Sequence, residues 1–123
     1  RVLRRGGSLL VEEVVGHDDP DVARFMADVE RRRDPQHVRA FRHIEWTAFM
    51  RAAGLTVIDE AVTTEQRHWA SWTDAMPEDT RRDLDRVVLD APESVRTASG
   101  FAVDAGRVAS FTATVARIRA DRD

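Results

Sequence analysis

The stretch Arg1-Val-Leu-Arg-Arg-Gly-Gly-Ser-Leu-Leu-Val-Glu-Glu-Val-Val15 decides the fold. Gly6 suits the left-handed position that ends a helix, because it has no Cβ to clash there. The residues after Ser8 are largely apolar and do not alternate with polar ones, so we predict a strand covered on both faces, as in a parallel sheet. Since the chain begins in the expected last turn of a helix and no strand precedes this one, we expect the second half of something larger.

Composition narrows the class of protein. The 123 residues, 42% hydrophobic, form one domain or part of one, and no linker divides 1–123, which we expect to be a single partial domain. A net charge of -3 and a pI near 5.8 argue against a general nucleic-acid or anionic-membrane binder. Without Cys or Lys, the chain has no disulfides, thiolate chemistry, Schiff base or P-loop lysine. No long apolar run or signal peptide is present, so we expect a cytoplasmic protein.

The middle of the chain reads as helix, helix and strand. Asp19 and Pro20 provide a cap and a first position for a helix over Asp21–Arg33. A second helix is expected over His43–Ala53, stopped by Gly54 and followed by a strand over Leu55–Thr63. The apolar faces of the two helices are Val22, Phe25, Met26 and Val29, and Trp46, Phe49, Met50 and Ala53.

The last third reads as helices and then a hairpin. From Thr64 the pattern turns helical, with Trp69, Trp72 and Met76 in one stripe, and Pro77 opens another helix. Ala105-Gly106 is a two-residue turn between a short arm, 101–104, and a long arm, 107–120, which is apolar on both faces.

Three motifs in this order resemble class I S-adenosylmethionine-dependent methyltransferases, in the ubiquinone/menaquinone-biosynthesis-like, type 11 group. Arg1 to Val11 resembles the family's leucine–lysine/arginine–proline–glycine–glycine turn and fifth strand, with Arg5 where proline is usual. Asp34-Pro-Gln-His-Val-Arg39 resembles a loop after an inserted lid helix. Glu45-Trp46 through Ala52-Ala53-Gly54-Leu55 resembles the helix–glycine–strand element that follows.

The resemblance implies an α/β fold. The chain would be the C-terminal portion of a Rossmann-like methyltransferase sheet, with three strands in the order 5-7-6, the last antiparallel, and a helical lid insertion. It also implies S-adenosylmethionine as the cofactor of the complete enzyme. The chain has no Gly-x-Gly-x-x-Gly motif, so the cofactor-side half is absent and we expect no cofactor to bind this chain alone.

Glu12 and Glu13 are the first candidates for chemistry. Both lie toward the carboxyl end of the opening strand, where open α/β sheets bind ligands. Glu13 could deprotonate an acceptor hydroxyl and Glu12 could orient it, and the alternative is a structural carboxylate bonded to backbone or Arg.

His37 and Arg39 lie in the loop that resembles the group's active-site loop. His37 could act as a general base and Arg39 could hold an anionic group of the acceptor, with plain loop packing as the alternative. Trp69 and Trp72 could stack on a flat ligand, or could simply pack in the core or lid. His17, Asp18 and Asp19 carry metal-capable atoms, but adjacent residues do not converge on one ion, so we expect no metal site.

Two functions stay open at this point. The chain either supplies the lid and acceptor pocket of a methyltransferase for a small molecule, or works as a stand-alone binding or dimerisation module. In the second case the exposed edge of the strand over Ser8–Val15 would pair with another copy.

Overall fold

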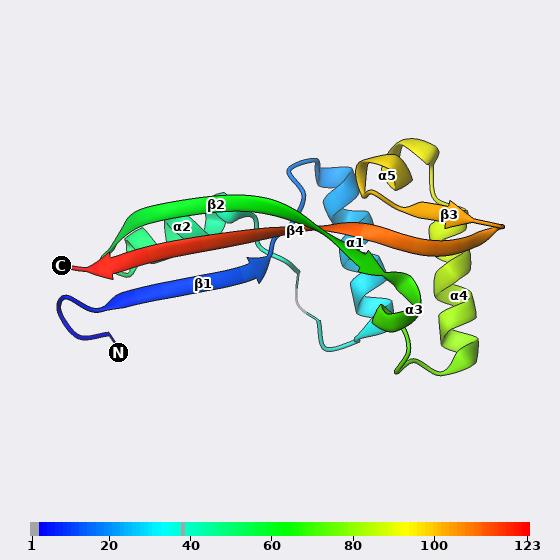
Figure 1. Ribbon diagram of the computed structural model, residues 1–123, viewed down its shortest axis with the longest axis horizontal. Helices are drawn as coiled ribbons and strands as arrows, with labels where there is room; N and C mark the ends of the chain where they lie inside the picture. Colours follow the sequence, from blue (N-terminus) through cyan, green and yellow to red (C-terminus); the bar gives the residue numbers. More distant parts are fainter. Residues whose placement is uncertain (1–2, 38) are drawn as a thin grey trace. The chain divides into compact units, whose positions relative to one another are not determined.

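The structure is a computed structural model that describes residues 3–37 and 39–123 (Figure 1). Its elements, in chain order, are β1 (Ser8–Val14), α1 (Pro20–Arg33), α2 (His43–Ala52), β2 (Leu55–His68), α3 (Trp69–Trp72), α4 (Glu78–Leu89), α5 (Glu93–Ala98), β3 (Ala102–Asp104) and β4 (Arg107–Arg122). The result is an α/β chain, as predicted.

The sheet places the last long strand in the middle. Its order is β1-β4-β2, and β3 pairs with β4 off this path. β4 runs antiparallel to β1, from Ser8 opposite Asp121 to Val14 opposite Val115. Figure 1 shows β1 and β2 pointing the same way and β4 pointing back between them. The predicted order, with the last strand antiparallel between the other two, is confirmed. The family's numbering of these strands stays a prediction.

The prediction that β1 is covered on both faces is wrong. Leu9 and Val11 pack against a buried cluster, whereas Leu10 is 63% exposed on the opposite face. The only neighbour of β1 among the described residues is antiparallel, and antiparallel sheets commonly leave one face to solvent. Residues 3–5 also form no helix: a turn at Arg5-Gly6 precedes the strand, although Gly6 does take the expected positive φ of +79°.

The chain divides into two compact units, neither of which is one continuous stretch. Unit 1 comprises 1–16, 40–64 and 114–123, and unit 2 comprises 17–39 and 65–113. Each contains part of β2 and part of β4. Because the chain passes between the units several times, no boundary was visible along the sequence. The single partial domain over 1–123 stays a prediction.

Unit 1 is a sheet with α2 packed on one face. Met50 of α2 contacts a buried row on β4, and partly buried residues from β1 and β2 complete the cluster. The buried members are Val15, Met50, Ala116, Ile118 and Ala120. Phe49, predicted to share the apolar face of this helix, is 48% exposed, and Thr47 is buried instead.

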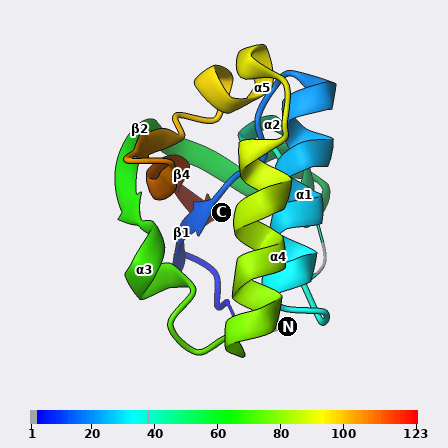
Figure 2. The same ribbon diagram turned by 90° about the vertical axis from the view of Figure 1, so that its right-hand side faces the viewer.

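Unit 2 holds the larger cluster. α1 packs beside α4 and α5 (Figure 2). The buried members of the cluster are Val29, Trp69, Leu84, Val88, Val108, Phe111 and Ala113. The apolar face predicted for α1 meets this core through Phe25, Met26 and Val29.

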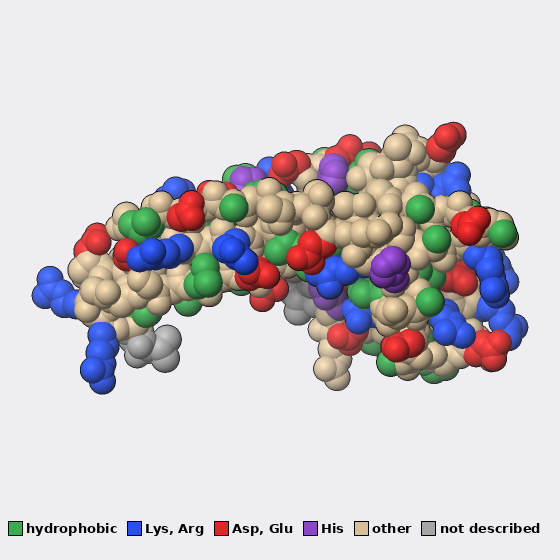
Figure 3. Space-filling view, in the orientation of Figure 1, with side chains coloured by type: hydrophobic (Ala, Val, Ile, Leu, Met, Phe, Trp, Pro, Cys, Tyr) green, Lys and Arg blue, Asp and Glu red, His purple; other side chains and the backbone are tan. Residues whose placement is uncertain are grey.

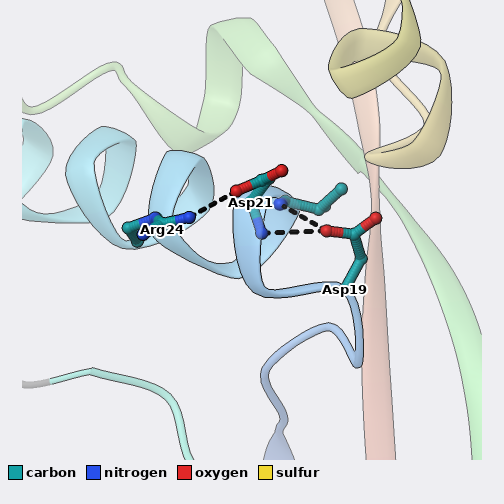
Figure 4. Close-up of polar contacts among 4 residues, drawn as sticks. Asp19, Asp21 and Arg24 are labelled. Carbon is teal, nitrogen blue, oxygen red and sulfur yellow. Dashed lines mark hydrogen bonds and ion pairs between the residues drawn. The ribbon is translucent and has the colours of Figure 1, made fainter.

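The start of α1 confirms the cap expected at Asp19. Its carboxylate accepts hydrogen bonds from the backbone nitrogens of Asp21, at 2.8 Å, and Val22, at 3.4 Å (Figure 4). Pro20 occupies the first turn, and an ion pair joins Asp21 to Arg24 one turn later. The cap satisfies two of the amides that every helix start leaves unpaired.

The predicted hairpin is confirmed, whereas the prediction for the segment before α3 is wrong. Ala105 and Gly106 have φ of 50° and 75°, the two positive values that a tight hairpin turn needs. The helix expected from Thr64 is strand as far as His68, and α3 spans only Trp69–Trp72. Pairing with the long β4 extends β2, as the 3.1 Å hydrogen bond from Gln66 Nε2 to Ser110 Oγ illustrates.

Candidate functional site

Glu12 and Glu13 have different surroundings on β1. Glu12 faces Arg117 of β4, whose Nε and Nη2 donate to one Glu12 oxygen at 3.1 and 2.9 Å. Glu13 lies opposite Ala116, and its exposed side chain makes no hydrogen bond or ion pair with the described residues. Glu12 thus matches the structural alternative, and Glu13 is the carboxylate open to solvent.

His37 is paired with a carboxylate of α1. Its Nε2 lies 2.5 Å from Glu30 Oε2, and both side chains are mostly buried, at 28% and 17% exposure. Burial raises the pKa of Glu30 above its ordinary value of 4.5, while the charges of His37 and Arg33 oppose that rise. His37, the loop residue predicted as a base, is therefore paired with α1 through Nε2. Nδ1 is the ring nitrogen that this pair does not use.

Arg39 lies on the same loop and is exposed. The anion-holding role of Arg39 stays a prediction. Val38, between the two, lies outside the described residues.

Trp69 and Trp72 form part of the unit 2 cluster. Trp69 is 3% exposed, and its Nε1 donates to Asp85 Oδ1 at 2.5 Å. Trp72 is partly buried, and the guanidinium carbon of Arg33 lies 4.2 Å from the centre of its ring. Trp69 is therefore a core residue, because its ring contacts other aromatic rings of this cluster. Of the two tryptophans, only Trp72 has exposed surface for a ligand.

His17 forms a turn with the residues that follow it. Its Nδ1 accepts a hydrogen bond from the backbone nitrogen of Asp19 at 3.0 Å, so this nitrogen is engaged. Within residues 3–37 and 39–123 no three His, Asp or Glu side chains gather as metal ligands.

A second histidine–carboxylate pair was missed by sequence reasoning. His43 Nδ1 lies 2.5 Å from Glu60 Oε1, with side-chain exposures of 30% and 32%. His43 is the first residue of α2 and Glu60 lies within β2. The sequence shows them 17 positions apart, and only the packing of α2 beside β2 brings them together.

The glycines of this chain do not fit a nucleotide cofactor. Gly6 and Gly7 are the only adjacent pair, and both are used in the turn before β1. Gly6 N donates to Arg122 O at 2.6 Å and Gly7 N to Arg4 O at 2.8 Å. A Cβ at Gly7 would meet Arg4 O at 2.9 Å, so its missing side chain makes room for the chain's own backbone.

The surface is mixed in charge. Figure 3 shows acidic and basic side chains interspersed over the visible face. None of the helices in the described part of the chain has both the length and the apolar character to cross a bilayer.

Comparison with known proteins identifies the fold. No protein-family model and no curated protein matches the chain. A presumed methyltransferase of Bacillus halodurans C-125, BH2331, superposes with a TM-score of 0.92 at 24% identity over 98% of this chain and 57% of its own. The YcgJ protein of Bacillus subtilis superposes with a TM-score of 0.89 at 25% identity over 100% of this chain and 54% of its own. The chain thus spans little more than half of each neighbour, and its α/β fold is that of the matching part of a presumed methyltransferase.

Proposed function

We propose that this chain is the acceptor-side portion of a class I, type 11-like S-adenosylmethionine-dependent methyltransferase that acts on a small molecule, with a cytoplasmic location. It is the substrate-side half of the fold and supplies the lid and part of the acceptor pocket. The cofactor belongs to the complete enzyme and is held by residues outside these 123.

One observation carries this proposal. Nearly the whole chain superposes on a presumed methyltransferase, yet it spans only 57% of that protein. The strand order supports it, because an antiparallel last strand between two parallel ones is the arrangement that the sequence resemblance implied.

The acceptor would meet the residues that follow the strands. Glu13 is the open carboxylate at the end of β1, and Arg39 is an exposed cation on the loop before α2. In unit 2, Arg39 is the residue proposed to hold an anionic group of the acceptor, and His37 is the candidate that the sequence offers for its proton chemistry. In unit 1, Glu13 is the candidate that the sequence offers for the same role. Trp72, also in unit 2, offers a partly buried ring to a flat acceptor. Glu12 and Trp69 are bonded to Arg117 and Asp85, each within its own unit, and have a supporting role there.

Calorimetric titration of S-adenosylmethionine tests this function. Binding heat is expected for a protein in which the chain continues upstream of Arg1, and none for the 123 residues alone. A longer protein that is folded by circular dichroism and still binds no cofactor would rule the proposal out.

Self-association is the second candidate function. β1 is an edge strand of the described sheet, and Leu10 stands 63% exposed on it. Such an edge can recruit a second copy. Light scattering across a concentration series should then show a dimer that Leu10→Lys dissociates, and a monomer at every concentration would contradict it.

A further inference from the structure

The His43–Glu60 pair has the geometry of a proton acceptor. Glu60 Oε1 lies 2.5 Å from His43 Nδ1. A carboxylate at this nitrogen holds the proton there and leaves Nε2 with a free lone pair. Among the described residues the His43 imidazole makes no other hydrogen bond or ion pair, and its side chain is 30% exposed. The ring is therefore partly open to a solute, and Nε2 is the ring nitrogen without a protein partner.

The backbone under His43 is fixed. Arg42 N donates to Glu45 Oε1 at 3.1 Å, and Glu45 N donates back to Arg42 O at 3.0 Å. The Glu45 side chain thus supplies one of the two bonds of a capping box, and the other bond of this first turn joins backbone atoms, because an arginine side chain has no acceptor. A base on a helix end held in this way is positioned more rigidly than one on a loop.

The segment just before His43 also lies close to the end of β1. Gly16 N donates to Phe41 O at 3.0 Å, and a Cβ at Gly16 would meet Ala40 O at 2.8 Å. The segment leading into α2 therefore packs directly on the residues that leave β1. Ligands of open α/β sheets bind beyond the carboxyl ends of the strands, so His43 lies at the edge where an acceptor is expected.

We propose that His43, oriented by Glu60, accepts the proton of a neutral hydroxyl-bearing acceptor. This inference rests on the proposed function. The acceptor O–H bond breaks, its proton goes to Nε2 of His43, and its electron pair stays on the acceptor oxygen, which becomes the nucleophile. The imidazolium that forms is stabilised by the negative charge of Glu60 at Nδ1.

The other histidines provide internal comparisons. His17 Nδ1 accepts a backbone N–H, so neutral His17 must carry its proton on Nε2. His37 presents Nε2 to its carboxylate, the reverse of His43. His43 alone among these three is expected to be the Nδ1–H tautomer.

Nitrogen-15 NMR of the 123-residue chain tests the geometry. Two-bond proton–nitrogen spectra, recorded with the imidazoles in their neutral form, should show Nδ1–H for His43 and Nε2–H for His17. Glu60→Ala should abolish the preference at His43, and Glu65→Ala, on the same strand and paired with Arg67, should not. An Nε2–H tautomer at His43 in the unmodified chain would overturn the proposal.

Kinetics of the longer, cofactor-binding protein tests the role. His43→Gln should lower kcat by about 10²-fold or more and remove the acidic limb of its pH profile, because general bases contribute on that scale. His17→Gln should leave both unchanged. An unaltered pH profile in His43→Gln would refute the role of His43 but not the methyltransferase function. A folded wild-type protein that binds no cofactor would refute both.

Discussion

The indole nitrogen of Trp69 donates a hydrogen bond to the carboxylate of Asp85 at a distance of 2.5 Å, and this bond joins α3 to α4. Trp69 is 3% exposed, and its ring contacts Trp72, Phe101 and Phe111. A buried tryptophan with a satisfied nitrogen is a structural centre of unit 2, which explains why the aromatic stripe seen in the sequence provides a core.

Asp85→Ala should destabilise the protein by about 1–3 kcal/mol, because the buried Trp69 nitrogen would lose its acceptor. Asp83→Ala, on the exposed side of the same helix, should cost less than about 0.5 kcal/mol. Urea unfolding followed by tryptophan fluorescence gives both values. Equal losses in the two variants would show that the bond to Trp69 adds nothing.

Gly100→Ala should be more damaging than Gly54→Ala. Both glycines have positive φ, +70° and +83°, which an alanine adopts at a cost of about 1 kcal/mol or more. A Cβ at Gly100 would also lie 2.3 Å from Thr112 Oγ1, whereas at Gly54 nothing lies within 4 Å. Thermal unfolding of both variants measures the difference.

Thr112→Ala provides the control for that clash. Added to Gly100→Ala it should restore only part of the stability, because the backbone nitrogen of Thr112 remains 3.2 Å from the new Cβ. Equal stability of the two single glycine variants would contradict the steric argument.

Local chemistry made part of the fold predictable. The Asp19 cap and the Ala105-Gly106 turn depend on neighbouring residues, and both are confirmed. The strand order followed from resemblance rather than from periodicity. The exposed face of β1 and the full length of β2 could not be predicted, because they depend on which strand pairs alongside.

The candidate site was less predictable. The partners of His37 and Glu12 are set by tertiary packing, and the Arg117 that engages Glu12 lies 105 residues away. His43 was recognised only as a helix start, since nothing in a pattern of adjacent residues places Glu60 beside it. Sequence patterns located the chemically capable side chains, but not the partners that decide which are free.

Stability should fall as the pH rises from 4.5 through the raised pKa of Glu30. In this range folded Glu30 retains a proton that the unfolded chain has released, so the folded state binds more protons and raising the pH favours unfolding. Glu30→Gln cannot titrate and should remove this part of the fall. Urea midpoints across a pH series provide the measurement.

Glu13→Gln is the matched control for Glu30→Gln, because Glu13 is exposed on β1. Its stability profile should follow that of the unmodified chain over the same pH range. Parallel profiles for Glu30→Gln and the unmodified chain would show that burial of Glu30 does not control this pH dependence.

The Glu12–Arg117 pair should contribute no more than about 1 kcal/mol. Both side chains are more than half exposed, at 51% and 64%, so water and salt screen the attraction. A double-mutant cycle with Glu12→Ala and Arg117→Ala should give a small favourable coupling that decreases at high salt. A coupling of zero at low salt would mean that Arg117 does not hold Glu12. Glu12 would then be as free as Glu13 to meet an acceptor, and the assignment of Glu13 as the open carboxylate of β1 would lose its basis.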